Sequence, residues 1–290
     1  MMTVTVAKSA GFCFGVRRAV GMAYAEAEKK KSGVYTLGPL IHNESVVDDL
    51  ASRGIRIVDE DLFCAEENQT IPAGSTVIVR SHGISEELHQ KLHHGGFHVV
   101  DATCPFVRKI HDVVKAKSLA GMPVVIIGNP DHPEVHGIQG WVHGESVVIE
   151  KPEDIHKISY PKDVEVCVIA QTTFNFHKFQ ELVEIIKSLG YHVNVTNTIC
   201  NATKERQEEA LLLAGSSDIM IVIGGKASSN TRKLYEICLS RCPATYFVQS
   251  PDDLKSVRFT NDCCVGITAG ASTPNTIIQE VSLDVRRTEF

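Results

Sequence analysis

In the stretch GFHVVDATC at residues 96–104, an apolar, β-branched segment is followed by a cysteine. A similar junction recurs at residues 190–200, which begin with GYHV and end with TIC. A third version lies near the N-terminus, where the apolar residues 3–7 lead into GFC at residues 11–13. The three cysteines, Cys13, Cys104 and Cys200, lie 91 and 96 positions apart (104 − 13 and 200 − 104). We interpret this pattern as a threefold internal repeat.

The segments between the cysteines repeat in the same order. Each cysteine opens a helix-like amphipathic stretch and has a cation four positions later. A short apolar strand that ends in glycine follows, at residues 34–38, 124–128 and 219–224. A second strand, at residues 77–79, 166–170 and 265–269, ends in polar residues. Short β-branched strands that alternate with helices predict an α/β fold with small parallel sheets covered by helices.

The repeats define three expected domains. They are residues 14–103, residues 104–199, and residues 200–290 together with 1–13. We expect the N-terminal strand, residues 3–7, to complete the third repeat and close the three into a ring. Because functional groups gather at the carboxyl ends of parallel strands, a pseudo-threefold ring would bring the loops of all three repeats to one centre.

Composition narrows the class of protein. The 290 residues carry a net charge of −6, which disfavours a partner such as a nucleic acid or an anionic membrane. No apolar run approaches the roughly 18 residues of a membrane span. The N-terminus shows no export signal, so we expect a cytoplasmic protein. Its nine cysteines should then stay reduced, and the question becomes which of them bind metal.

Three cysteines at matched helix starts favour a metal or cluster site, because a helix N-terminus and a nearby cation both stabilise a thiolate. Zinc with three cysteines and a histidine is one interpretation. A 4Fe–4S cluster, which would keep one iron free for substrate, is the other. The spacing alone does not separate them. The remaining cysteines have no matched positions. We expect Cys167, Cys263 and Cys264 to lie in core strands. We give Cys238 and Cys242 little weight as metal ligands and assign no role to Cys64.

Two further sets of residues occupy matched loops. His42, His132 and Ser228 follow the first strands, and His82, Thr172 and Ser272 follow the second strands. These donors, together with loop N–H groups at helix starts, predict a pocket for an anion, best a phosphate or diphosphate. Glu134 lies two residues after His132. Beside an anionic ligand the pKa of this carboxyl should rise, which would make Glu134 a proton donor.

The sequence closely resembles the 4-hydroxy-3-methylbut-2-enyl diphosphate reductase family, also called LytB. The matching blocks span nearly the whole chain in order. They are Gly11-Phe12-Cys13, Ile41-His42-Asn43, Ser81-His82-Gly83, Asp101-Ala102-Thr103-Cys104-Pro105, His132-Pro133-Glu134-Val135, Gln171-Thr172-Thr173, Thr198-Ile199-Cys200, Ser228-Ser229-Asn230 and Thr268-Ala269-Gly270-Ala271-Ser272.

The resemblance implies a trefoil of three α/β domains around one 4Fe–4S cluster held by Cys13, Cys104 and Cys200. The free iron would bind the substrate hydroxyl. The implied reaction is the last step of the non-mevalonate (MEP/DOXP) isoprenoid pathway. There (E)-4-hydroxy-3-methylbut-2-enyl diphosphate loses its hydroxyl group and gives isopentenyl and dimethylallyl diphosphate. The implied electron donor is a ferredoxin or a flavodoxin.

The resemblance also assigns roles to site residues, with Glu134 as the catalytic acid that delivers protons. The residues implied to hold the diphosphate are His42, His82, Ser228, Ser229, Asn230 and Ser272, and those implied to surround the hydroxyl end are His132 and Thr172. The alternatives are an iron–sulfur hydro-lyase, which would need no reductant, and a structural metal-binding protein.

Overall fold

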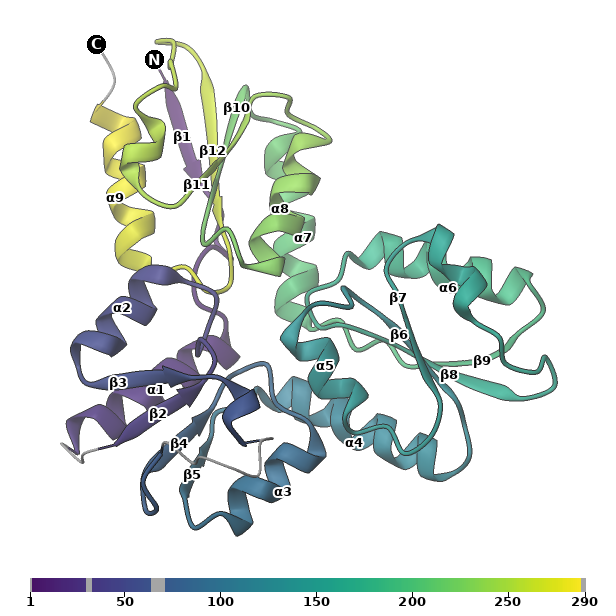
Figure 1. Ribbon diagram of the computed structural model, residues 1–290. Coiled ribbons are helices and arrows are strands. Elements are labelled where there is room, and N and C mark those ends of the chain that lie inside the picture. The colour runs from purple at the N-terminus through teal and green to yellow at the C-terminus, as the bar shows by residue number, and fades with distance from the viewer. Residues whose placement is uncertain (1, 30–32, 64–70, 288–290) are drawn as a thin grey trace. The chain divides into compact units, whose positions relative to one another are not determined.

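The computed structural model describes residues 2–29, 33–63 and 71–287 (Figure 1). In this part of the chain the strands form three four-stranded sheets, and every strand pair is parallel. The predicted α/β class with small parallel sheets is therefore confirmed. Cys64 lies outside the described residues.

The first sheet has the strand order β3-β2-β4-β5. Its elements are α1 (Phe14–Glu28), β2 (Val34–Leu37), α2 (Glu44–Ser52), β3 (Ile55–Val58), the 3-10 helix η1 (Glu60–Phe63), β4 (Thr76–Val79), α3 (Glu86–His94) and β5 (His98–Asp101). The central strands β2 and β4 are buried along their whole length, as expected for a parallel sheet covered on both faces.

The second sheet has the order β7-β6-β8-β9. Its elements are α4 (Pro105–Leu119), β6 (Val124–Ile127), α5 (Pro133–Gln139), β7 (Ser146–Ile149), η2 (Pro152–Lys157), β8 (Glu165–Ala170), α6 (Phe176–Ser188) and β9 (His192–Val195). Proline at the first position of α4 and of α5 fits a helix start, where no backbone N–H is needed.

The third sheet has the order β1-β12-β10-β11. Its elements are β1 (Thr3–Val6), α7 (Asn201–Ala214), β10 (Ile219–Ile223), α8 (Ser229–Leu239), β11 (Thr245–Val248), η3 (Pro251–Leu254), β12 (Cys264–Ala269) and α9 (Asn275–Arg287). Strand β1 pairs with β12 in the register Thr3 to Cys264. It thus takes the edge position that β5 and β9 take in the other two sheets.

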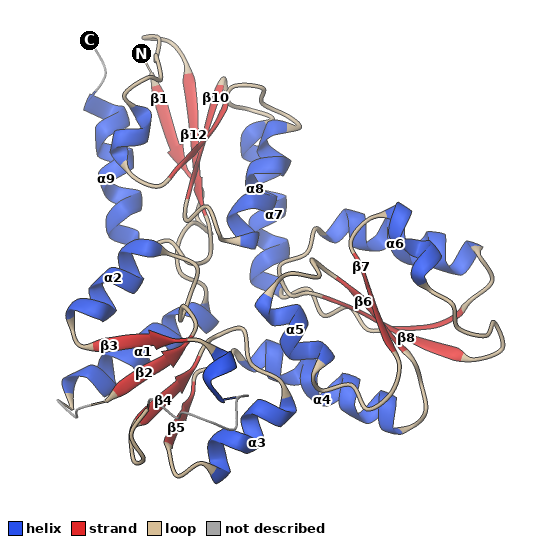
Figure 2. Ribbon diagram, in the orientation of Figure 1, coloured by secondary structure: helices blue, strands red, loops and turns tan. Residues whose placement is uncertain are grey.

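Helices cover both faces of the sheets, as Figure 2 shows most clearly for the third one. One core of the third sheet contains Ile278, Val281 and Val285 of α9, whereas the opposite core contains Ala210 of α7 and Leu234 of α8. In the second sheet, α6 packs on one face and α4 and α5 pack on the other. This layering leaves the carboxyl ends of the strands, and the loops that follow them, as the places for functional groups.

The chain separates into two compact units. Unit 1 comprises residues Met1–Val16, His42–Val46 and Cys200–Phe290, and unit 2 comprises Arg17–Ile41 and Val47–Ile199. The third sheet therefore belongs to unit 1, and the first and second sheets belong to unit 2. The division into three domains and their pseudo-threefold arrangement stay predictions.

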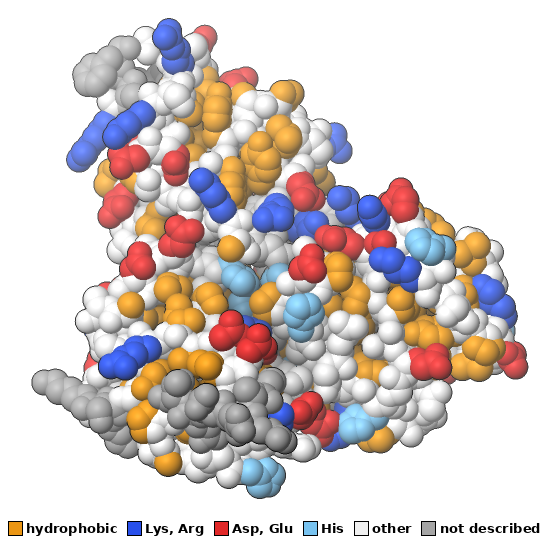
Figure 3. All heavy atoms as spheres, viewed as in Figure 1, with side chains coloured by type: hydrophobic (Ala, Val, Ile, Leu, Met, Phe, Trp, Pro, Cys, Tyr) orange, Lys and Arg blue, Asp and Glu red, His pale blue; other side chains and the backbone are white. Residues whose placement is uncertain are grey.

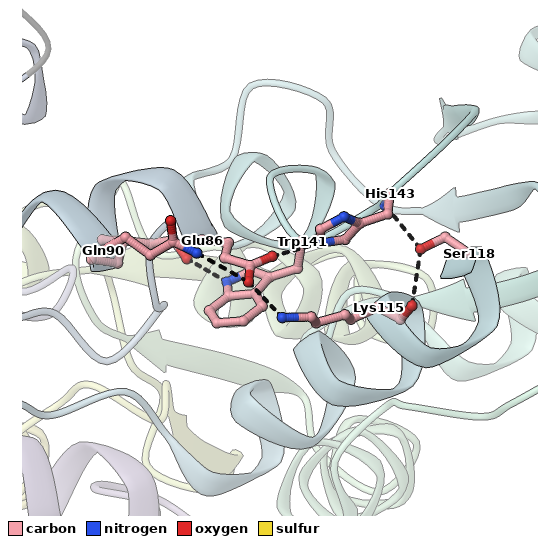
Figure 4. Close-up of polar contacts among 7 residues, drawn as sticks. Glu86, Gln90, Lys115, Ser118, Trp141 and His143 are labelled. Carbon is pink, nitrogen blue, oxygen red and sulfur yellow. Dashed lines mark hydrogen bonds and ion pairs between the residues drawn. The ribbon is translucent and has the colours of Figure 1, made fainter. Parts of the chain in front are cut away.

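A tryptophan and an ion-pair network join the two sheets of unit 2 (Figure 4). The indole Nε1–H of Trp141 donates to the Ile84 carbonyl oxygen at 2.8 Å. The Glu86 carboxylate, at the start of α3, binds Lys115 Nζ at 2.5 Å and lies 2.7 Å from Nε2 of His143. Groups from the first repeat therefore bond directly to groups from the second.

The cysteines outside the matched positions are mostly packing residues. Cys167, Cys238, Cys242 and Cys263 are buried, and the cysteines of the described chain form no disulfide. The expectation that Cys264 belongs to the core is wrong, because it is the first residue of β12 and is exposed there. Cys263 is buried but precedes the strand rather than lying in it.

Acidic and basic side chains are interspersed over the face seen in Figure 3, with apolar groups scattered between them. Among the described residues, no helix is both long enough and apolar enough to cross a bilayer.

Candidate functional site

The three matched cysteines all lie at helix starts. Cys104 and Cys200 are the residues that immediately precede α4 and α7, and Cys13 immediately precedes α1. Each is half-buried, so the thiols are accessible to a ligand without being fully solvated. Cys200 Sγ lies 3.1 Å from Thr203 Oγ1, and the Cys13 N–H donates to the Ala271 carbonyl oxygen at 3.2 Å. This placement agrees with thiolate ligands.

Unit 1 brings together loops from three segments of the chain. Ser272, which follows β12, donates its hydroxyl to the His42 carbonyl oxygen at 3.1 Å and lies 3.5 Å from the Ser228 hydroxyl. Ser228 precedes α8, and its Oγ accepts the N–H of Thr231. A Cβ on Gly225 would lie 2.6 Å from the His42 carbonyl oxygen, so this close approach needs glycine.

Asn230 adds a buried donor to the same loops. Its Nδ2 is inaccessible to solvent and has no hydrogen-bond partner among the described residues. A buried amide donor without a partner costs free energy, which an anionic oxygen at this position would recover. Ser229, the first residue of α8, is only half-buried. The donor set of unit 1 therefore fits an oxygen-rich anion.

Unit 2 carries the remaining histidines. His82 and His132 lie with ring centroids 5.3 Å apart in an edge-to-face arrangement. His132 caps α5, because its Nδ1 accepts the N–H of Glu134 at 3.1 Å. A neutral imidazole that accepts through Nδ1 carries its proton on Nε2, and His132 is thereby set to donate a hydrogen bond through Nε2.

Glu134 is buried beside Thr172. Its Oε1 accepts the Thr172 N–H at 2.6 Å, and its Oε2 accepts the Thr172 hydroxyl at 2.7 Å. Burial raises the pKa of Glu134 to about 7, although the two bonds from Thr172 lower it. By contrast, the neighbouring Asp131 is exposed. Glu134 is therefore a carboxyl group that can hold a proton at neutral pH.

The predicted site residues fall into two groups, one in each unit. Unit 1 contains Cys13, His42, Cys200, Ser228, Ser229, Asn230 and Ser272, and unit 2 contains His82, Cys104, His132, Glu134 and Thr172. Within unit 1, direct contacts join Ser272 to Ser228 and to the His42 backbone. Within unit 2, direct contacts join Glu134 to His132 and Thr172. Their roles stay predictions.

Sequence reasoning missed one charged residue near the cysteines. The repeat pattern pointed to the cations four positions after each cysteine. One of them, Arg108, forms an ion pair with Asp101. Arg206, two positions beyond Lys204, interacts electrostatically with both Cys13 and Cys200. Helical periodicity could have identified Arg206 as buried, because Thr203, Gln207 and Ala210 lie on the same buried face of α7.

The model of the LytB protein family matches residues 4–286. The 4-hydroxy-3-methylbut-2-enyl diphosphate reductase of Caldanaerobacter subterraneus subsp. tengcongensis is 40% identical over 281 residues. The match covers 97% of this chain and 95% of the relative.

Two solved structures are similar to the whole fold. One is an (E)-4-hydroxy-3-methyl-but-2-enyl diphosphate reductase described as the terminal enzyme of the non-mevalonate pathway. It is 40% identical, has a TM-score of 0.70, and the match covers 99% of this chain and 100% of that one. The other is the E-1-hydroxy-2-methyl-but-2-enyl-4-diphosphate reductase of Plasmodium falciparum. It is 26% identical, with a TM-score of 0.88 and coverage of 98% and 87%.

Proposed function

The chain belongs to the LytB protein family, and from this premise we propose that it is a 4-hydroxy-3-methylbut-2-enyl diphosphate reductase. The reaction removes the hydroxyl group of the allylic diphosphate as water. It consumes two electrons and two protons, breaks the C–O bond and forms a C–H bond. The products are isopentenyl and dimethylallyl diphosphate, and the step ends the non-mevalonate pathway. The observation that carries the proposal is the buried, protonatable Glu134 bound to Thr172.

Cys13, Cys104 and Cys200 are the proposed ligands of one 4Fe–4S cluster. Their positions at helix starts and their partial exposure support thiolate ligation. With three cysteines bound, such a cluster offers one iron as a Lewis acid for the substrate hydroxyl and supplies electrons for C–O cleavage.

The diphosphate is proposed to bind His42, His82, Ser228, Ser229, Asn230 and Ser272. The partnerless Nδ2 of Asn230 and the adjacent hydroxyls of Ser228 and Ser272 support this role. Because many donors fix the diphosphate end, the reacting hydroxyl would be held in one place, which can contribute several kcal/mol.

Glu134 is the proposed proton donor at the hydroxyl end, beside His132 and Thr172. With a pKa raised to about 7, it holds its proton near neutral pH yet can release it to the leaving oxygen. Thr172 fixes both carboxyl oxygens, so the acid is oriented before substrate arrives. The Nε2–H of His132 would donate a second hydrogen bond to the same region.

The proposed electron donor is a ferredoxin or a flavodoxin. This part of the proposal rests on the family resemblance, and a cytoplasmic location is proposed with it.

The test begins with iron and sulfide analysis of anaerobically purified protein, with absorption spectra before and after the allylic diphosphate is added. Nearly four iron and four sulfide per chain and a perturbed spectrum are expected. Turnover should require a reductant, whereas a hydro-lyase would need none. Glu134→Gln should retain the cluster and bind substrate but lose most turnover. The matched control is Asp131→Asn, an exposed carboxylate three residues before Glu134. Near-normal turnover in Glu134→Gln would remove Glu134 from the mechanism, and stoichiometric zinc without sulfide would refute the reductase.

A further inference from the structure

Arg206 is a buried arginine on α7, six positions after Cys200, and only 3% of it is exposed. Its guanidinium spans two loops of unit 1. Nη1 donates to the Ala269 carbonyl oxygen at 2.8 Å, at the end of β12, and Nη2 donates to the Gly11 carbonyl oxygen at 3.0 Å. The first loop leads to Ser272, and the second leads to Cys13. One side chain therefore connects the segment that carries a proposed cluster ligand with the segment that carries a proposed substrate ligand.

The same helix holds the segment before Cys13 at a second place. Glu209, one turn beyond Arg206, accepts the N–H groups of Lys8 and Ser9 at 2.7 and 2.8 Å. Helix α7 thus begins at one proposed ligand and fixes the backbone that carries another. The Cys13 N–H in turn donates to the Ala271 carbonyl oxygen.

The charge of Arg206 is the more unusual feature. Moving a guanidinium out of water costs free energy unless negative charge lies nearby. The groups that interact electrostatically with Arg206 are Cys13, Cys200 and Glu209. The Glu209 carboxylate is already occupied by the Lys8–Ser9 backbone and the Ser9 hydroxyl. Arg206 Nε is buried and has no hydrogen-bond partner among the described residues. As cluster ligands, Cys13 and Cys200 would be thiolates, and they would then supply counter-charge for a group that stays protonated in proteins.

We propose that Arg206 is a positioning residue whose buried positive charge offsets the two ligands Cys13 and Cys200 and raises the reduction potential of the cluster they hold. This inference rests on the proposed function, because it requires a cluster on these cysteines. Reduction adds one electron and hence one negative charge to the cluster. A fixed positive charge nearby in a medium of low dielectric constant stabilises the reduced form more than the oxidised form.

The test compares cluster-loaded full-length proteins by redox titration, read from the visible absorption and the electron paramagnetic resonance of the cluster. Arg206→Gln removes the charge but keeps an amide donor. Arg206→Lys keeps the charge but loses the planar fork. The matched control is Arg286→Gln, because Arg286 also donates to a backbone carbonyl of the N-terminal segment, at Val4, but is exposed on α9.

We expect Arg206→Gln to lower the ratio of reduced to oxidised cluster about tenfold at a fixed applied potential, which for a one-electron couple is a shift of about 59 mV. Arg206→Lys should restore the wild-type ratio within about a factor of three, and Arg286→Gln should not change it. A wild-type ratio in loaded Arg206→Gln would overturn the inference, and so would an equal change in Arg206→Lys.

Failure to load the cluster is also informative. If Arg206→Gln does not assemble a cluster whereas Arg206→Lys does, the charge is required and the inference stands. If neither variant assembles a cluster while Arg286→Gln does, the fork rather than the charge is needed, and the inference fails. A wild-type protein that holds no cluster would refute the proposed function itself, so the two failures are distinguishable.

Discussion

Replacing Glu134 with glutamine should make the protein more stable at alkaline pH. The side chain is buried, and burial raises its pKa to about 7 from an ordinary value of 4.5. A carboxyl group whose folded-state pKa is raised stabilises the fold fully below the unfolded-state value, and this contribution is lost as the pH rises through the folded-state value. The free energy of unfolding of the wild type should therefore decline between pH 4.5 and pH 7 and then level off with respect to this group.

The magnitude follows from the two pKa values. The interval from 4.5 to 7, at about 1.4 kcal/mol for each pH unit, amounts to about 3 kcal/mol. Glutamine has the shape of the protonated acid but does not ionise. Its amide oxygen can accept the Thr172 N–H, and its amide nitrogen can donate to the Thr172 hydroxyl, whose own proton then turns away. Glu134→Gln should thus keep the contacts and lose the pH dependence.

The assay is urea denaturation under anaerobic conditions, followed by circular dichroism from about pH 4 to about pH 9. The difference in unfolding free energy between Glu134→Gln and wild type should be small at the acid end. It should rise to about 3 kcal/mol in favour of the variant above neutral pH. Asp131→Asn controls for loss of an exposed carboxylate three residues before Glu134. Parallel curves for wild type and Glu134→Gln across the range would refute the claim that Glu134 holds its proton near neutrality.

Three other substitutions test separate parts of the site and the fold. Cys13→Ser should lose iron, sulfide and turnover together, and an active variant with wild-type iron content would contradict the three-cysteine site. Thr172→Val removes the hydroxyl that stabilises the Glu134 carboxylate, so the pKa of Glu134 should rise. The alkaline fall in turnover should then move up by roughly one pH unit in a pH–rate profile. An unchanged profile would show that the hydroxyl does not influence this pKa. Trp141→Phe removes the bond to the Ile84 carbonyl and should destabilise unit 2 by about 1 kcal/mol in urea denaturation, whereas an unchanged midpoint would show that this bond is dispensable.

The sequence reveals the central strands of each sheet and the strands that precede the three cysteines. Residues 34–38, 124–128 and 219–224 were predictable because apolar, β-branched runs ending in glycine are typical of central parallel strands, and they correspond to β2, β6 and β10. The edge strands β3, β7 and β11 escaped prediction. Each has four residues with only one or two of them buried, and their pairing becomes evident only when the neighbouring strand is in place.

The candidate site was predictable where it repeats. Matched positions after the recurring strands indicated Ser228, Ser272 and Thr172, because each follows a strand that recurs in every repeat. The contact between Glu134 and Thr172 was not predictable, because the two residues are 38 positions apart and their contact depends on the pairing of β6 with β8. Burial, which sets the pKa of Glu134, likewise depends on packing that no local pattern shows.

Arg206 escaped prediction for a different reason. The position six residues after the cysteine is Ala19 in the first repeat and Ile110 in the second, and both are buried. A search for repeated features therefore passes over the arginine, since the repeats agree in burial there and differ in charge. The three cysteines share a helix start, and the buried cation Arg206 interacts electrostatically with Cys13 and Cys200. Where internal symmetry positions a cofactor, residues that break the symmetry can thus make its ligands electrostatically unequal. Such residues are best sought on the buried face of each helix whose first turn follows a ligand.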